Sequence, residues 1–312
     1  MALGDYYRRL KRDYARALDE YAQGERQSPS NAELFRGIGQ AEQALGRWEP
    51  ALQHIRQAQL LDPRSVTTDT VLTTALLWQR QYPEALKAAD QWIALAPTSL
   101  QSVETKAMIR LSQGDLAGAK AISESPPRNV PLTQLVAYFA TYYELFWILT
   151  GEQQALLMRL APSEFDDDRA SWGLALAGAS ALRGEGTRTR AYADSARIAL
   201  EEQLRAAPED GQLHVLLGTA LAYLGRKADA VREGEKAVAL LPLTKDATTS
   251  TYLQHQLARI YILVGEPEKA LDQLEPLLKI PYYLSPGWLK IDPTFDPLRK
   301  NPRFQKLVAG TS

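Results

Sequence analysis

Cysteine is missing from the 312-residue sequence, and histidine occurs only three times. Without cysteine the chain can form neither a disulfide bond nor a thiolate metal site. The histidines His54, His214 and His255 do not follow the spacing of metal-ligand motifs. The composition therefore predicts no metal centre and no disulfide framework, and it selects no cellular compartment.

The chain also lacks an excess of charge of one sign and any long apolar run. Lysine and arginine number 36 against 37 aspartates and glutamates, a formal net charge of −1. A dedicated nucleic-acid-binding protein is expected to be basic, so this balance argues against that class. No run of about 18 apolar residues is present, so no membrane-spanning helix is predicted. The opening residues do not resemble a signal peptide.

What the sequence does contain is a small residue that recurs at a fixed interval. Alanine stands at intervals of 34 residues at Ala17, Ala51, Ala85 and Ala119, and proline repeats the same interval at Pro29, Pro63 and Pro97. A fixed period in this range is typical of repeat proteins built from two-helix units. Chance spacing in an ordinary helical bundle is the alternative, but apolar residues at helical spacing between these positions favour a repeat.

The second unit shows why these residue types recur. Gly39 and Ala51 are small because the two helices of a hairpin are expected to cross there. Gly46 ends the first helix, since glycine tolerates positive φ, and Pro63 ends the second. With Phe35, Ile38, Gly39, the Gly46-Arg47-Trp48 turn, Ala51, Ile55, Ala58 and Pro63, the stretch resembles the tetratricopeptide repeat (TPR), although Glu42 stands where that pattern has tyrosine.

This resemblance implies an all-α fold, a right-handed superhelical solenoid of about eight TPR-like helical hairpins with a short C-terminal helical cap. We expect one solenoid over residues 1–312, with regular repeats at 1–125 and 211–280, irregular hairpins at 126–210 and the cap at 281–312. Because Met1 falls inside a repeat, we also expect the sequence to be a fragment of a longer protein.

Several local elements follow from the same patterns. We predict one aromatic-rich helix over Pro131–Leu149, a short partner over Glu152–Leu160, and a hairpin of Asp167–Leu182 with Thr187–Ala206. Asp166-Asp167-Asp168 is interpreted as a helix cap and Gly184-Glu185-Gly186 as a turn. In the cap, Asp292-Pro293, Asp296-Pro297 and Asn301-Pro302 each predict a helix start.

Three stretches are similar to something narrower than the repeat family. Residues 137–147, 224–228 and 283–298 resemble the C-terminal TPR array of bacterial serine/threonine protein kinases and related signalling proteins. The resemblance implies a sensory or scaffolding array. The sequence has no glycine-rich loop after a strand and no His-Arg-Asp or Asp-Phe-Gly motif, so no kinase activity is expected of this chain.

In the TPR family the first helices of the hairpins line a concave groove that binds peptides. The resemblance implies that the groove-lining residues here are Arg36, Gln40, Gln43, Thr70, Thr74, Glu104, Met108, Thr219, Tyr252, His255 and Arg259. A solvated helix face without a ligand is the alternative. Some members of the family bind the C-terminal carboxylate of a peptide with lysine and arginine at set repeat positions. At the matching positions of this chain only Arg36 is charged, so binding of a chaperone tail is not expected.

Near the N-terminus, a basic face is formed by Arg8, Arg9, Lys11, Arg12 and Arg16. This face is either simply solvated or used by an acidic partner.

The leading prediction is a non-catalytic interaction module that binds a protein or peptide, without a cofactor, nucleic acid or membrane insertion. No acid/base pair, nucleophile or metal cluster favours an enzyme. The alternative is a small-molecule or lipid sensor with an apolar pocket around Tyr138, Tyr142 and Trp147, although these aromatic residues also suit a helix buried on several sides. The identity of the partner, the oligomeric state and the compartment are not predicted.

Overall fold

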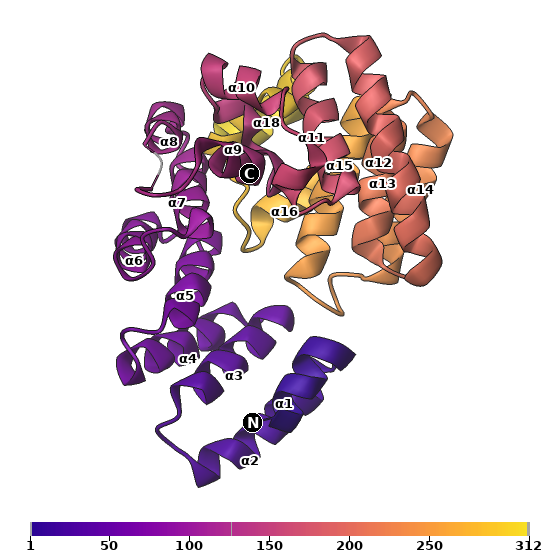
Figure 1. Cartoon of the computed structure of the whole chain (residues 1–312). Coiled ribbons are helices and arrows are strands. Elements are labelled where there is room, and N and C mark those ends of the chain that lie inside the picture. The colour runs from indigo at the N-terminus through magenta and orange to yellow at the C-terminus, as the bar shows by residue number, and fades with distance from the viewer. Residues whose placement is uncertain (1, 126, 311–312) are drawn as a thin grey trace. The chain divides into compact units, whose positions relative to one another are not determined.

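The computed structural model describes residues 2–125 and 127–310, and within these every regular element is helical. The chain folds into two compact units (Figure 1). The first comprises Met1–Ile109, Leu241–Thr251 and Pro281–Tyr283, and the second comprises Arg110–Leu240, Tyr252–Ile280 and Leu284–Ser312. Each unit is described by itself.

The first unit is a series of helical hairpins. It contains α1 (Ala2–Tyr6), the π-helical turn η1 (Tyr7–Lys11), α2 (Tyr14–Gln27), α3 (Ala32–Ala44), α4 (Trp48–Leu61), α5 (Val66–Trp78), α6 (Tyr82–Leu95) and α7 (Leu100–Ser112) as far as Ile109. Helix α1 packs on α2, α3 on α4 and α5 on α6, and successive hairpins contact each other through α2 with α3 and α4 with α5.

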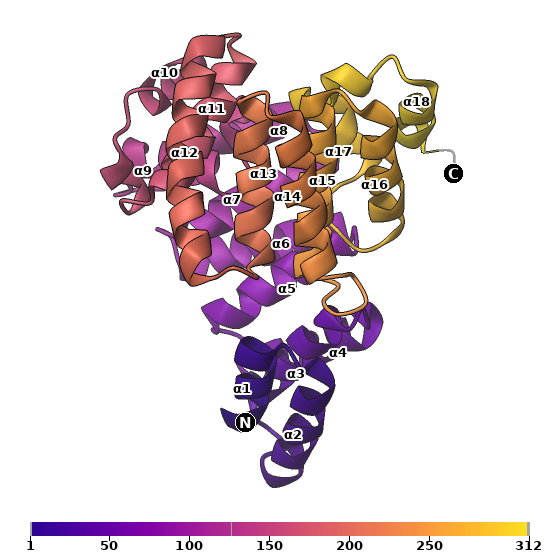
Figure 2. The ribbon, with the colours of Figure 1, turned by 90° about the vertical axis from the view of Figure 1, so that its right-hand side faces the viewer.

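The second unit continues the pattern after an irregular stretch. It contains α8 (Leu116–Ser123), α9 (Leu132–Thr141), the 3-10 turn η2 (Leu145–Ile148), α10 (Gly151–Leu157), the 3-10 turn η3 (Pro162–Phe165), α11 (Arg169–Leu182), α12 (Gly186–Ala206), α13 (Gly211–Tyr223), α14 (Lys227–Leu240), α15 (Thr249–Val264) from Tyr252 on, α16 (Pro267–Lys279), α17 (Pro286–Ile291), the 3-10 turn η4 (Pro293–Leu298) and α18 (Pro302–Ala309). Helices α12, α13 and α14 lie side by side in Figure 2.

Small residues lie where the helices of a hairpin cross, as the period predicts. A Cβ atom on Gly39 would lie 2.6 Å from Cγ1 of Ile55 and 2.9 Å from the carbonyl oxygen of Ala51. In the hairpin of α13 and α14, a Cβ atom on Gly218 would lie 2.9 Å from the carbonyl oxygen of Ala230. Ala17, Ala51, Ala85 and Ala119 are all fully buried. The predicted fold class, an all-α solenoid of TPR-like hairpins, is confirmed.

The prediction of one helix over 131–149 was wrong. Helix α9 ends at Thr141, and Tyr143 and Glu144 then take positive φ, both 57°. This backbone conformation is unfavourable for residues with a Cβ atom, so it needs support from elsewhere in the fold. Glu144 forms an ion pair with Arg259 of α15, and all four residues of η2 are buried. Contacts with distant residues therefore override the local helical pattern.

Of the other local predictions, most agree with the structure and one does not. Asp168 caps α11 by accepting a hydrogen bond from the backbone nitrogen of Ala170 at 2.9 Å, and Gly184 turns with φ of 73°. Asp292 and Asn301 cap η4 and α18 as predicted. Asp296-Pro297 does not start a helix, because it lies inside η4. The expected boundary between the regular repeats and the irregular hairpins, at 125–126, follows α8, and Pro126 lies outside the described residues.

Two segments from late in the sequence pack against the first hairpins, within the first unit. The backbone nitrogen of Ala247 donates to the carbonyl oxygen of Ala44 at 2.8 Å, and that of Tyr282 donates to the carbonyl oxygen of Trp78 at 3.1 Å. The rings of Trp78 and Tyr282 meet edge to face with centroids 5.3 Å apart. In a simple solenoid each repeat contacts only its neighbours, so these contacts are an addition to the expected architecture.

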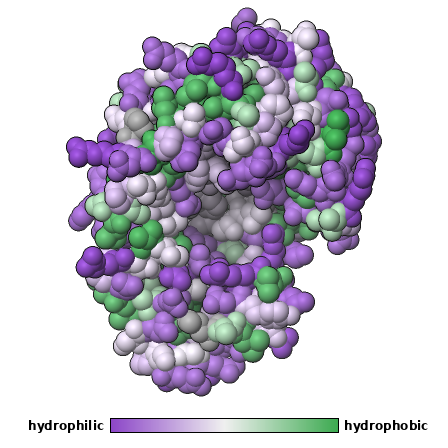
Figure 3. All heavy atoms as spheres, in the orientation of Figure 1, coloured by the Kyte–Doolittle hydropathy of each residue, from purple (hydrophilic) through white to green (hydrophobic). Residues whose placement is uncertain are grey.

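Hydrophilic residues dominate the face of the molecule in Figure 3, and hydrophobic residues occur there in small groups. Large hydrophobic side chains that the structure exposes include Leu10, Leu60, Tyr142, Leu182 and Leu263. None of the described helices has the length and apolar character to cross a membrane.

Candidate binding site

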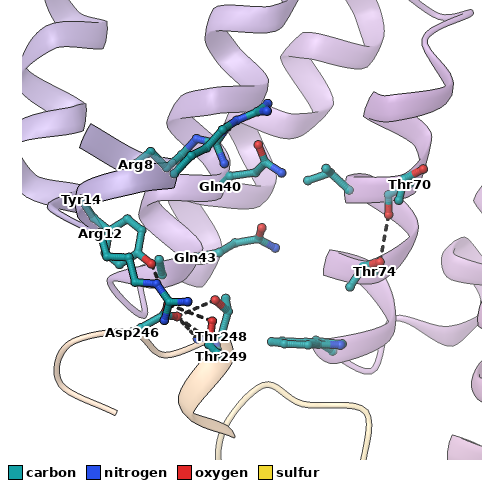
Figure 4. Close-up of a pocket in the computed structure, with 14 residues that line it drawn as sticks. Arg8, Arg12, Tyr14, Gln40, Gln43, Thr70, Thr74, Asp246, Thr248 and Thr249 are labelled. Carbon is teal, nitrogen blue, oxygen red and sulfur yellow. Dashed lines mark hydrogen bonds and ion pairs between the residues drawn. The ribbon is translucent and has the colours of Figure 1, made fainter. Parts of the chain in front are cut away.

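A polar hollow of about 390 Å³ opens in the first unit (Figure 4). Its lining consists of Arg8, Arg9, Arg12, Tyr14, Gln40, Gln43, Ala44, Thr70, Val71, Thr74, Trp78, Asp246, Thr248 and Thr249. This volume lies at the lower end of the roughly 300–1,000 Å³ typical of ligand sites. The arginines, amides and hydroxyls are suited to hydrogen bonding with an anionic or polar group.

The side chains come from four parts of the unit. Figure 4 shows Gln40 and Gln43 of α3 projecting toward Thr70 and Thr74 of α5. The hydroxyls of Thr70 and Thr74 each donate to the carbonyl oxygen four residues earlier, at 2.9 Å. Helices therefore hold this pair of facing walls in place before any ligand binds.

Asp246 closes one side of the hollow and is held by a dense set of hydrogen bonds. Its carboxylate accepts from the hydroxyl of Tyr14 at 2.6 Å, and from both the backbone nitrogen and the hydroxyl of Thr248 and Thr249 at 2.6–3.0 Å. Burial alone would raise the pKa of Asp246, but the bonds from Thr248, Tyr14 and Thr249 hold it below its ordinary value. Burial and the bond to Asp246 raise the pKa of Tyr14. Asp246 is thus an ionised structural group.

The three arginines of the lining differ in their exposure and in their distance from the nearest carboxylate. Arg8 contacts Asp5 at 3.0 Å and Tyr21 at 3.1 Å, and its side chain is 12% exposed. The side chains of Arg9 and Arg12 are 61% and 46% exposed, and they lie 3.8 and 3.9 Å from their nearest carboxylates. Arg9 and Arg12 are therefore the cations at this site that a ligand can reach.

The local sequence explains the position of these arginines. Arg12 follows η1 in a left-handed conformation with φ of 50°, and its backbone nitrogen bonds to the carbonyl oxygen of Tyr7. Asp13 then caps α2 by accepting from the backbone nitrogen of Arg16 at 3.1 Å. This tight turn places the arginines of η1 beside Tyr14.

The hollow brings together four of the residues predicted to line a groove, namely Gln40, Gln43, Thr70 and Thr74. Arg36 is half-buried one turn earlier on α3 and is not part of the lining. Glu104 and Met108 of α7 are 1% and 2% exposed, so they belong to the interior of the first unit.

Most of the predicted residues in the second unit are also interior. Thr219, His255 and Arg259 are buried and Tyr252 is half-buried. Thr219 donates to the carbonyl oxygen of Val215 at 3.0 Å, and the ring of His255 stacks on Phe295. Burial lowers the pKa of His255 to about 3, so its ring is neutral near pH 7.

The predicted aromatic pocket is only partly assembled. Trp147 lines a cavity of about 300 Å³ in the second unit, whereas Tyr138 and Tyr142 do not. The rings of those two tyrosines lie against each other with centroids 4.6 Å apart.

Sequence reasoning missed Tyr14, Asp246, Thr248 and Thr249, and it treated the arginines only as a basic face. The arginine cluster was a usable signal. No such signal was present for Asp246, because its partner Tyr14 is 232 residues away in the sequence.

Among the residues that the structure describes, no group of three or more histidine, aspartate or glutamate side chains could hold a metal ion.

Glu104 provides a test of the interior position of α7. Burial raises the pKa of its carboxyl well above the ordinary value, and Oε1 has no hydrogen-bond partner within the described part of the chain. A group with a raised folded pKa contributes its full stability below its unfolded pKa of about 4.3, and this contribution is lost as the pH rises. Glu104→Gln should therefore raise the free energy of unfolding by about 1–2 kcal/mol at pH 7 and leave it nearly unchanged at pH 4. Urea unfolding of both proteins at the two pH values measures this, and equal stability at pH 7 would contradict it.

Comparisons with known proteins concern the fold alone. No family model matches the chain, and no curated protein matches it in sequence. Similar solved structures include PilW, a widely conserved type IV pilus biogenesis factor, at 17% identity and a TM-score of 0.44, covering 77% of this chain and 91% of PilW. A tetratricopeptide repeat protein from Parabacteroides merdae has 13% identity and a TM-score of 0.38, covering 87% of this chain and 88% of that one. MamA has 15% identity and a TM-score of 0.37, covering 77% of this chain and 95% of MamA. Identities and TM-scores this low support no inference about partners or ligands.

Proposed function

We propose that this chain is a non-catalytic protein-interaction module and that its N-terminal hairpins bind an acidic segment of a partner protein. The observation that carries the proposal is the polar hollow, in which the exposed Arg9 and Arg12 lie beside the amides of Gln40 and Gln43. Asp246, 3.9 Å from Arg12, cancels only part of this positive charge, because the three arginines of the lining face only two carboxylates of the described residues within ion-pair distance, Asp5 and Asp246.

The chemistry of the lining favours a carboxylate-bearing segment. Hydrogen bonds between a guanidinium and a carboxylate are charge-assisted and stronger than neutral ones. The helices of the hollow are formed before binding, so little conformational entropy is lost on the side of the receptor. Because Arg9 and Arg12 are exposed, salt should weaken the interaction.

A selection of random peptides on the full chain tests this function. We expect the selected peptides to be enriched in aspartate and glutamate. For a selected peptide, fluorescence anisotropy should show that Arg9→Glu with Arg12→Glu weakens binding about 100-fold or more, since each reversal replaces an attraction with a repulsion. A peptide with asparagine and glutamine in place of the acidic residues should bind about as weakly.

The matched control is Arg169→Glu with Arg205→Glu, which changes the net charge equally at exposed positions of the second unit. This variant should bind the acidic peptide as the unmodified chain does. Selection of neutral or basic peptides, or equal loss of affinity in the control, would overturn the proposal.

The resemblance of residues 283–298 to the TPR arrays of bacterial signalling proteins supports one further step in the same proposal. The module would dock its partner for an effector domain of a larger signalling protein. The open reading frame upstream of Met1 tests this step, because an encoded kinase, cyclase or DNA-binding domain is the expected result and an unrelated or missing domain would contradict it.

A further inference from the structure

The second unit contains a cavity whose walls are mostly apolar. It has a volume of about 300 Å³ and is lined by Phe146, Trp147, Gly178, Ala181, Leu182, Tyr223, Arg259, Ile262, Leu263, Pro293, Thr294 and Pro297. The lining residues belong to helices α11, α13 and α15, each the first helix of a hairpin, and to the turns η2 and η4. The exposed Leu182 and Leu263 belong to this lining, so apolar surface continues to the solvent.

The packing of η2 defines one wall of the cavity. A Cβ atom on Gly178 would lie 2.8 Å from the ring of Phe146 and 3.3 Å from the hydroxyl of Tyr223. Phe146 and Trp147 are 7% and 8% exposed. Glycine at this position of α11 therefore allows the aromatic turn to approach closely, and the wall is fixed by close packing.

Arg259 carries the positive charge of the cavity lining. Among the lining residues that the structure describes, it is the one with a charged side chain, and only 6% of the residue is exposed. Tyr223 adds no negative charge, because burial, with a smaller effect of Asp292, raises its pKa to about 12. A small apolar cavity with a guanidinium in its wall is complementary to an anion that carries an apolar body.

The counter-ion of Arg259 comes from the strained turn before η2. Glu144 forms the ion pair with Arg259, although it and Tyr143 must both take left-handed backbone conformations to do so. Glu144 itself is not part of the cavity lining. A carboxylate supplied from the cavity side would compete with Glu144 for the same guanidinium.

We propose that this cavity binds an amphipathic monocarboxylate, with its apolar body between Trp147, Ala181 and Leu263 and its carboxylate on Arg259. Glu144 then acts as an internal competitor that the ligand displaces. The site lies in the second unit and is independent of the peptide function proposed for the first.

Calorimetric titration of the full chain with decanoate, and with decanol as the neutral analogue, tests the proposal. Decanoate should bind about tenfold or more tightly than decanol, because only the anion gains the guanidinium. Glu144→Gln removes the competing charge and should strengthen decanoate binding by about tenfold, leaving decanol unchanged. A purely structural role for the ion pair predicts no such gain.

A second variant does not depend on the buried ion pair. Ala181→Phe places a ring in the exposed part of the lining and should abolish decanoate binding, whereas Ala191→Phe, at an exposed position of α12, should not. Equal binding of decanoate and decanol, undiminished binding to Ala181→Phe, or no binding to either the unmodified chain or Glu144→Gln would each overturn the proposal.

Discussion

Replacing Asp246 by alanine should lower the free energy of unfolding by about 3 kcal/mol or more, because a buried carboxylate with several hydrogen bonds is lost. The bonds come from Tyr14, Thr248 and Thr249, and the one to Tyr14 joins the segment 241–251 to the first hairpins. The substitution leaves the hydroxyl of Tyr14 buried without its acceptor. Urea unfolding followed by circular dichroism measures the loss.

The effect should depend on pH in a defined direction. Although burial opposes it, the bonds from Thr248, Tyr14 and Thr249 lower the folded pKa of Asp246 below its ordinary value. A depressed folded pKa contributes stability that is complete above the unfolded pKa, about 3.9, and is lost as the pH falls through the folded pKa. The gap between the unmodified chain and Asp246→Ala should therefore be full at pH 7 and shrink below pH about 4. A gap that stays constant down to pH 2 would show that the charge of Asp246 contributes nothing.

Gly39→Val should destabilise the second hairpin by about 3 kcal/mol or more, since overpacking against backbone cannot be relieved by a side-chain rotation. The new Cβ atom would lie 2.9 Å from the carbonyl oxygen of Ala51 and 2.6 Å from the side chain of Ile55. Amide hydrogen exchange in α3 and α4 measures the effect locally, and protection there should fall by about 100-fold or more.

Gly186→Val serves as the control, because a Cβ atom at Gly186 would meet only the end of the Arg190 side chain, at 3.6 Å. This variant should leave protection in α3 and α4 unchanged. Equal protection in Gly39→Val and the unmodified chain would mean that the helices do not cross at this glycine.

The repeat could be predicted from the sequence because its causes are local. Ala51 belongs to the series of alanines spaced by 34 residues, and Ala51, Gly39 and Gly46 each act on helices that are neighbours in the chain. The same is true of Asp292 and Asn301, which cap the helices that directly follow them.

Features that depend on distant partners could not be predicted. The chain turns at Tyr143 and Glu144 because Glu144 pairs with Arg259, and the sequence around the turn is aromatic and helix-like. For the same reason the resemblance to the TPR implied Gln40, Gln43, Thr70 and Thr74 as lining residues but not the carboxylate of Asp246 beside them. Periodicity gives the face of a helix and not what packs against that face.

The account rests on the polar hollow of the first unit being a binding site, and threonine methyl resonances test this most directly. The full chain with labelled threonine methyl groups would be titrated with an acidic peptide selected as above. We predict concentration-dependent shifts for Thr70, Thr74, Thr248 and Thr249, which line the hollow, and none for Thr141 and Thr187, which do not. Binding of the peptide with shifts confined to threonines outside the hollow would contradict the account.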